Sequence, residues 1–193
     1  MKKIDYLNDE MAKNLFKFKP ILVDFLNSVF SYSKTPLTST INYEDRELTP
    51  KFFKGKKSFV DLYVRNQDGE DINIEIQKRK LKDFCKRAIR YLVRLSDNME
   101  KGQKDEDMTR TVCLSIINFY PDEIKFDKDF HYSNSLRSDA SPHEKFSELL
   151  EMHFINIVHW RKLNPNILNK IESMSRLEKW TAYLCSSLTK IER

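Results

Sequence analysis

Residues 58–77 read SFVDLYVRNQDGEDINIEIQ, and this stretch decides the fold because two alternating runs flank a short turn. Strict alternation of apolar and polar residues is typical of a strand with one buried face. Gly69 lies in the turn and can adopt the positive φ that a tight hairpin needs. The apolar members of the two runs are Val60, Leu62, Val64, Ile72, Ile74 and Ile76. The stretch therefore predicts a β-hairpin with one face in the core.

The length of the turn determines which residues of this hairpin face each other. A two-residue loop, Asp68-Gly69, would place the two apolar rows on opposite faces. A three-residue loop over 67–69, with Gly69 in the left-handed conformation, pairs Leu62 with Ile74 and puts both apolar rows on one face. Because a shift of one residue would expose a whole apolar row, we predict the three-residue loop.

Two acidic side chains face each other in the predicted register. Asp61 lies directly opposite Glu75, with Cβ atoms about 4.5–5.5 Å apart, and Gln77 shares the strand face of Glu75. Like charges in this position destabilise a sheet. Mg²⁺ would remove the repulsion, because it binds carboxylate oxygens and keeps waters for further ligands. The alternative is a surface hairpin neutralised by a neighbouring cation, namely Lys56, Lys57, Lys78 or Arg79.

Composition excludes several other classes of protein. The 193 residues include 34 Lys+Arg and 29 Asp+Glu, and the net charge of +5 favours a local basic groove over a wholly basic surface. The three glycines, Gly55, Gly69 and Gly102, are too far apart for a phosphate-binding loop. No apolar run approaches the roughly 20 residues that span a bilayer. No apolar segment follows the N-terminal lysines as a secretory signal requires, so we expect no membrane partner.

The cysteines and histidines form no metal-binding or disulfide pattern. Three widely spaced cysteines fit a reducing, cytoplasmic setting, and they are Cys85, Cys113 and Cys185. Four histidines show no metal-ligand spacing, and we expect these to be surface or half-buried residues: His131, His143, His153 and His159.

The rest of the chain predicts a mixed α/β fold. Periodicity predicts helices over 20–30, 79–101 and 174–191, and strands near 41–43 and over 111–119, 129–136 and 152–158. The apolar face of the last helix predicts core packing or a dimer seam. This order is typical of a central mixed sheet flanked by helices. We expect a single domain over 1–193, with 160–193 as a C-terminal helical segment.

The predicted helix over 79–101 carries a stripe of cations. Arg87, Arg90 and Arg94 recur at helical spacing with Tyr91 beside them, and Lys82 and Lys86 lie on the flank. A separate apolar stripe comprises Leu81, Phe84, Cys85, Ala88, Leu92, Leu95 and Met99. The cations could be a solvated face paired with acids of the same helix. Their position after the acidic hairpin favours contacts with nucleic-acid phosphates.

These motifs resemble the PD-(D/E)XK nuclease superfamily. More narrowly, they resemble the PD-(D/E)XK nuclease family transposases, also called recombination-promoting nucleases. The resemblance rests first on the spacing D-x13-E-x-Q at Asp61, Glu75 and Gln77. It covers about residues 14–185, through further segments in the family's order: FLNSVF at 25–30, NIEIQ at 73–77, Arg87, Tyr91, Arg94 and Gly102, HFIN at 153–156, and LEKW at 177–180.

The resemblance implies a restriction-endonuclease-like core and a metal-dependent DNA endonuclease that acts in DNA recombination. It implies Asp61 and Glu75 as ligands of Mg²⁺ or Mn²⁺. Gln77 stands where the superfamily usually has Lys, and its amide can orient water or phosphate without supplying charge. An acid from the first helix is common in such sites, and Asp24 is the only acid inside that predicted helix. DNA is the expected partner, and we expect the arginine stripe to contact it. A homodimer is a further possible partner.

Departures from the family pattern favour a second reading. The usual Glu of the "FIEL" strand is Asn156, and the segment after Gly102 is strongly charged. The chain also ends soon after the helix that contains Trp180. A catalytically inactive member of the same fold, which binds nucleic acid or a partner nuclease, is therefore the alternative.

Overall fold

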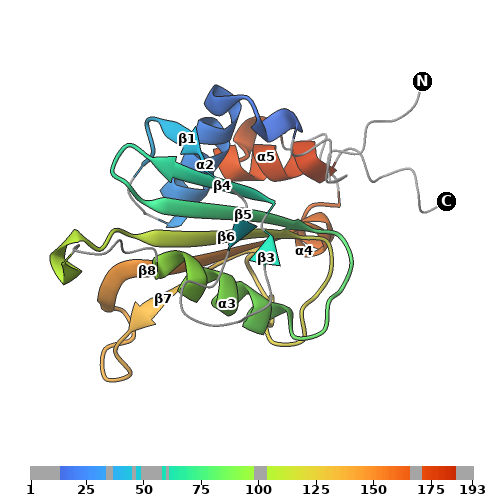
Figure 1. Ribbon diagram of the computed structural model, residues 1–193. Coiled ribbons are helices and arrows are strands. Elements are labelled where there is room, and N and C mark those ends of the chain that lie inside the picture. Colours follow the sequence, from blue (N-terminus) through green and yellow to red (C-terminus); the bar gives the residue numbers. More distant parts are fainter. Residues whose placement is uncertain are drawn as a thin grey trace.

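A six-stranded mixed sheet forms the centre of the computed structural model, which describes residues 14–33, 37–44, 47–48, 58–59, 61–97, 104–165 and 171–185 (Figure 1). The strand order is β1-β4-β5-β6-β8-β7. Strands β5, β6 and β8 run parallel, and the other neighbours pair antiparallel. The strands are β1 (Ile41–Tyr43), β4 (Leu62–Asn66), β5 (Asp71–Gln77), β6 (Thr111–Ile117), β7 (His131–Arg137) and β8 (Lys145–Asn156). A separate pair comprises β2 (Glu47–Leu48) and β3 (Ser58–Phe59).

Helices cover both faces of the sheet, as Figure 1 shows. On one face α2 (Lys19–Ser33) packs beside α5 (Arg176–Cys185), and on the other lies α3 (Phe84–Ser96). Helix α4 (Ile157–Leu163) continues directly from β8, and the short 3₁₀ helices η1 (Asp105–Asp107) and η3 (Ile171–Ser173) lie in connections. The predicted mixed α/β architecture is confirmed. Within the described ranges, no helix combines the length and apolarity that a bilayer span requires.

The apolar face of the β4–β5 hairpin forms the main core with α2 and α5. Burial of apolar side chains from the sheet and from the two helices stabilises the packing of these helices on the sheet. The buried members include Leu62, Val64, Ile72, Ile74 and Ile76 of the hairpin, Leu22, Phe25, Leu26 and Val29 of α2, and Leu177 and Leu184 of α5. The predicted apolar stripe of the last helix is therefore core packing rather than a dimer seam over these residues.

The predicted register of the hairpin is confirmed. Leu62 pairs with Ile74. The N–H of Gly69 donates to the carbonyl oxygen of Asn66 at 3.2 Å, and Gly69 has a φ of 76°. The loop thus contains three residues, with glycine in the left-handed position. Val60, whose predicted partner is Ile76, lies outside the described residues.

Helix α3 begins later than predicted. It starts at Phe84 rather than at residue 79, because Asp83 has a φ of 56° and a ψ of 37°. This left-handed backbone interrupts any helix that approaches from the preceding residues. The predicted end, over 98–101, lies outside the described residues.

Other boundaries also differ from the predictions. The strand predicted over 152–158 begins at Lys145 and ends at Asn156, and the next two residues belong to α4. The helix predicted over 174–191 begins at Arg176, and residues 186–191 lie outside the described part. Two strands are also shorter, since β6 ends at Ile117 and β7 begins at His131.

Candidate active site

A row of polar side chains lies on the hairpin face that α3 covers. Tyr63 donates its hydroxyl hydrogen to Asp71 Oδ1 at 2.7 Å, and Arg65 Nε donates to the same oxygen at 2.9 Å. Burial, together with the hydrogen bond to Asp71, raises the pKa of Tyr63 well above its ordinary value. Asp71, Asn73 and Glu75 are all buried. The polar row is therefore an interior layer beneath α3, and each of its charges needs a partner.

Asp61 is fixed beside Glu75 at one end of this row. The ladder between β4 and β5 ends at the pair of Leu62 and Ile74, and Asp61 lies in a bend just before it. The Oδ2 atom of Asp61 accepts a hydrogen bond from the backbone N–H of Ile76 at 2.9 Å. This bond holds the Asp61 carboxylate at the residue that follows Glu75, although Asp61 itself is not part of the ladder.

The cation on Glu75 comes from α3. Arg87 Nη2 lies 2.5 Å from Glu75 Oε1. The side chain of Glu75 is 6% exposed and that of Arg87 is 33% exposed. Arg87 Nε also donates to the hydroxyl of Tyr91 at 2.9 Å. The sequence assigned Arg87 to a phosphate and named residues 56, 57, 78 and 79 as cations for the acids, whereas the structure places Arg87 on Glu75.

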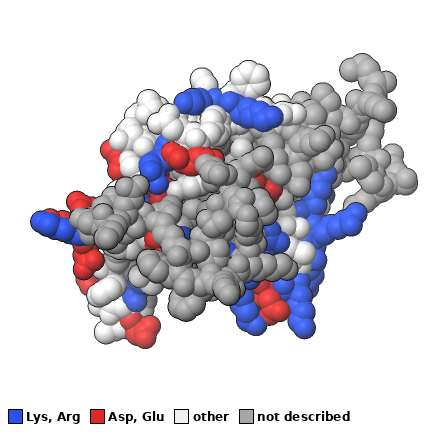
Figure 2. Space-filling view, in the orientation of Figure 1, with Lys and Arg blue, Asp and Glu red and all other residues white. Residues whose placement is uncertain are grey.

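The remaining residues of the predicted cationic stripe have different environments. Tyr91 is buried, and the guanidinium carbons of Arg87 and Arg90 lie 5.2 and 5.9 Å from the centre of its ring. Arg90 is exposed and Arg94 is half-buried. Figure 2 shows Lys and Arg side chains gathered at the lower right, where Figure 1 places the β5–α3 connection and the start of α3. A basic surface therefore adjoins the end of β5, while Tyr91 packs inside.

Gln77 ends β5 and is half-buried. Its Nε2 atom donates to the carbonyl oxygen of Arg79 at 3.0 Å. Gln77 shares the strand face of Glu75 by the alternation of the strand. The three predicted catalytic residues thus lie in one region, and the bond to Arg79 turns the Gln77 amide nitrogen toward the following segment.

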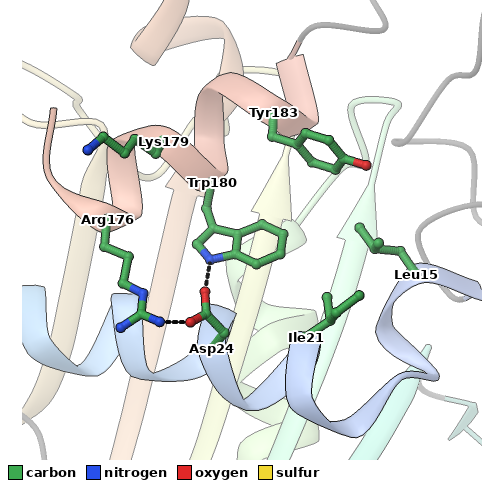
Figure 3. Close-up of a pocket in the computed structure, with 7 residues that line it drawn as sticks. All are labelled: Leu15, Ile21, Asp24, Arg176, Lys179, Trp180 and Tyr183. Atoms are coloured by element: carbon green, nitrogen blue, oxygen red, sulfur yellow. Dashed lines mark hydrogen bonds and ion pairs between the residues drawn. The ribbon is translucent and has the colours of Figure 1, made fainter. Parts of the chain in front are cut away.

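Asp24 does not join this region. Its Oδ2 atom accepts a hydrogen bond from Trp180 Nε1 at 2.7 Å, and its carboxylate forms an ion pair with Arg176 (Figure 3). These residues line a pocket of about 430 Å³ between α2 and α5. Helices α2 and α3 cover opposite faces of the sheet, so Asp24 has its partners on α5 rather than among the acids beneath α3.

Asn156, the departure from the family pattern, caps α4. Its Oδ1 atom accepts from the N–H of His159 at 2.9 Å, and its Nδ2 atom donates to the carbonyl oxygen of Phe119 at 3.0 Å. The side chain is fully buried. A glutamate could accept a hydrogen bond here but could not donate one. The amide therefore has a structural role, which sequence reasoning missed because Phe119 belongs to a distant segment.

Three of the four histidines are buried, contrary to the prediction. His131 Nε2 and His153 Nδ1 are 3.0 Å apart. Burial lowers the pKa of His131 to about 4, and burial also lowers the pKa of His153 well below its ordinary value. His159 lies between the hydroxyl of Tyr120 and the carbonyl oxygen of Asp127. Both ring nitrogens of His159 have hydrogen-bond partners, which lowers the cost of burying it. Sequence spacing does not reveal such partners.

The two hairpin acids suit a hard divalent cation. Asp61 and Glu75 supply carboxylate oxygens, and Mg²⁺ binds one or two carboxylates together with waters and phosphate oxygens. In the part of the chain that the structure describes, no group of three His, Cys, Asp or Glu side chains is arranged to hold a metal ion. The donors that these residues offer such an ion are two carboxylates, one of which is paired with Arg87.

The fold and these acids define a class of nuclease-like protein: a mixed sheet, two acids on a central hairpin, and a basic helix after it. The family model for the PD-(D/E)XK nuclease family transposases matches residues 4–192, so the chain belongs to this family. Neither a search of curated proteins nor a search of solved structures returned a match. The predicted family and restriction-endonuclease-like fold are thus confirmed, and membership supports a nuclease-type function.

Proposed function

We propose that the protein is a Mg²⁺- or Mn²⁺-dependent DNA endonuclease with its active site at Asp61, Glu75 and Gln77. The observation that carries this proposal is the hydrogen bond from Ile76 N–H to Asp61, which holds one acid beside the other. A divalent ion bound there would supply an activated water and stabilise charge on the phosphate. Membership of a nuclease family supports this reading.

The side chains of the chain would then have distinct roles. Asp61 and Glu75 hold the ion, and Gln77 orients the attacking water or a phosphate oxygen by hydrogen bonds. Gln77 supplies no charge, so the transition state depends on the ion and on nearby arginines. Arg90 and Arg94 bind the DNA backbone from α3, with Tyr91 packed between the helix and the sheet.

A second candidate function is supported by the same site. Arg87 already compensates the buried charge of Glu75, so this carboxylate has a cation from the protein itself. A catalytically inactive family member that binds nucleic acid or a partner nuclease would need no metal ion at these acids. The two candidates differ in whether the acids support metal-dependent chemistry.

Cleavage of supercoiled DNA by the purified protein in Mg²⁺ or Mn²⁺ tests the proposal. Asp61→Asn and Glu75→Gln keep hydrogen-bond acceptors for Ile76 and Arg87, so both variants should fold. We expect each to lower the cleavage rate at least roughly a hundredfold, because a charged metal ligand is lost. Asp71→Asn is the matched control, since it neutralises a buried acid of the same face away from Glu75, and it should keep cleaving.

Two results would contradict the proposal. Parent-like cleavage by Asp61→Asn or Glu75→Gln would show that the acids are not the site. DNA binding by the parent without cleavage in any divalent metal would establish the inactive reading instead.

A further inference from the structure

We infer that Arg87 is an exchangeable counter-ion of the candidate metal site. It pairs with Glu75 in the structure and leaves this carboxylate when a divalent cation binds. This inference rests on the proposed function, and it assigns to Arg87 a role in controlling metal affinity. It is carried by the geometry of one ion pair, Arg87 Nη2 to Glu75 Oε1 at 2.5 Å.

The buried carboxylate of Glu75 needs a cation beside it. The carboxylate lies under α3 with a side-chain exposure of 6%. A carboxylate removed from water is strongly destabilising unless a cation compensates its charge. Arg87 provides that compensation, and its position in the first turn of α3 couples the helix to the charge of the acid beneath it.

The Arg87 side chain has room to change its position, because part of it is exposed to solvent. Its side chain is 33% exposed, and its other hydrogen-bond partner is the hydroxyl of Tyr91, on the same helix at 2.9 Å. The guanidinium can therefore withdraw along the buried Tyr91 ring without any shift of the backbone. The guanidinium of Arg90 lies at the same ring, 5.9 Å from its centre.

Metal and guanidinium compete for Glu75 because like charges at one carboxylate repel. By linkage, the factor by which the Arg87–Glu75 ion pair weakens metal binding equals the factor by which bound metal weakens this ion pair. A displaced guanidinium next to the acids can bind a phosphate in a bidentate manner. The exchange would thus couple metal loading to substrate binding through one side chain.

The matched comparison lies on the same sheet face. Arg65 Nε contacts Asp71 Oδ1 at 2.9 Å, and Asp71 is as buried as Glu75, with a side-chain exposure of 6%. This pair has the same chemistry but does not adjoin Asp61. Removing the charge of Arg65 should weaken the fold as removing that of Arg87 does, without any effect on the metal.

The experiment measures Mn²⁺ affinity in the absence of DNA, by calorimetry, for the parent, Arg87→Gln, Arg87→Lys and Arg65→Gln. Gln at position 87 keeps a hydrogen-bond donor for Glu75 and removes the charge. We expect Arg87→Gln to bind Mn²⁺ on the order of tenfold more tightly than the parent and to melt at a lower temperature without metal. Arg87→Lys should restore parent-like affinity, and Arg65→Gln should lower the melting temperature with unchanged affinity.

A second measurement uses the parent alone and needs no variant to fold. Mn²⁺ should increase the rate at which an arginine-specific dicarbonyl modifies Arg87, followed by peptide mass spectrometry, while Arg65 keeps its rate. Unchanged or weaker Mn²⁺ binding in folded Arg87→Gln, or an Arg87 modification rate that Mn²⁺ does not alter, overturns the counter-ion role and leaves the metal site standing. Failure of the parent and of every variant to bind Mn²⁺ overturns the metal site itself, and with it this inference.

Discussion

Asp24 has two partners from α5, and these differ in what they contribute. Its bond from Trp180 Nε1 is 2.7 Å long and partly buried, whereas its ion pair with Arg176 involves side chains that are 31% and 67% exposed. Exposed ion pairs contribute little because solvent screens them. The indole hydrogen bond is therefore the contact through which Asp24 stabilises the α2–α5 interface.

Asp24→Ala tests this assignment. We expect the free energy of unfolding to fall by about 1 kcal/mol, because Trp180 loses its acceptor, while DNA cleavage stays at the parent level. Urea titration followed by Trp fluorescence measures the first quantity, and Arg176→Ala is the control, with an expected loss of at most about 0.5 kcal/mol. Loss of cleavage in folded Asp24→Ala would instead return Asp24 to the catalytic site.

At this scale the sequence predicted which acids lie together but not what compensates them. Strand alternation and a local turn, which act over a few residues, predicted that Asp61 lies near Glu75, although Asp61 is in a bend outside the ladder. The Arg87–Glu75 pair depends on where α3 sits on the sheet, and the Asp24–Trp180 bond joins residues 156 positions apart. No spacing rule covers such distances, so both partners had to come from the folded structure.

Among the elements, the β4–β5 hairpin was predictable because its determinants are local. The alternation of apolar residues predicts which strand face is buried, and Gly69 predicts the three-residue loop. Helix α3 was predictable in its buried stripe but not in its start, because a left-handed Asp83 is rare for a residue other than glycine. The start of α4 was missed because Ile157 continues the apolar pattern of β8 into the helix.

Gly69→Ala measures what the hairpin loop requires. An added Cβ would meet Thr109 Cγ2 at 3.6 Å, an ordinary contact, so the cost comes from the backbone φ of 76° alone. We expect the free energy of unfolding to fall by about 1 kcal/mol. Gly69→Asn should lose less, since Asn tolerates this conformation better. Urea midpoints compare the three proteins, and equal stability of parent and Gly69→Ala would contradict the loop assignment.

Across the whole molecule, a buried polar network beneath α2 links the residues just before β5 and β6 to strands β8 and β7. Arg110 Nη2 lies 2.7 Å from Glu70 Oε2, and Arg110 Nη1 lies 3.6 Å from Glu151 Oε2. His153 Nε2 is 3.6 Å from Glu151 Oε1, and His131 follows at 3.0 Å from His153. Because this network is interior, the protonation of its histidines is linked to the stability of the entire sheet.

Stability should therefore fall on mild acidification. The pKa of His131 is about 4 in the folded protein against 6.5 ordinarily. Between these values the unfolded chain binds more protons, so stability is fully present above pH 6.5 and declines as pH falls toward 4. For His131 alone the loss reaches about 3 kcal/mol.

Urea unfolding from pH 8 to pH 4 measures this dependence. His131→Gln should flatten the decline between pH 7 and 5, where few carboxylates titrate, and the exposed His143→Gln should not. A decline that is identical in His131→Gln and the parent would show that the buried histidine is not its source.

The packing of α2 against α5 also sets the order in which the protein can fold as it is made. The apolar face of α2 emerges from the ribosome well before α5, and the two share one core. At roughly 5–20 residues per second, the wait is on the order of 10 s. The hairpin and its neighbouring strands can pair in that interval, but the layer above them stays uncovered. Of the described helices, α5 is synthesised last, and it closes the core over α2.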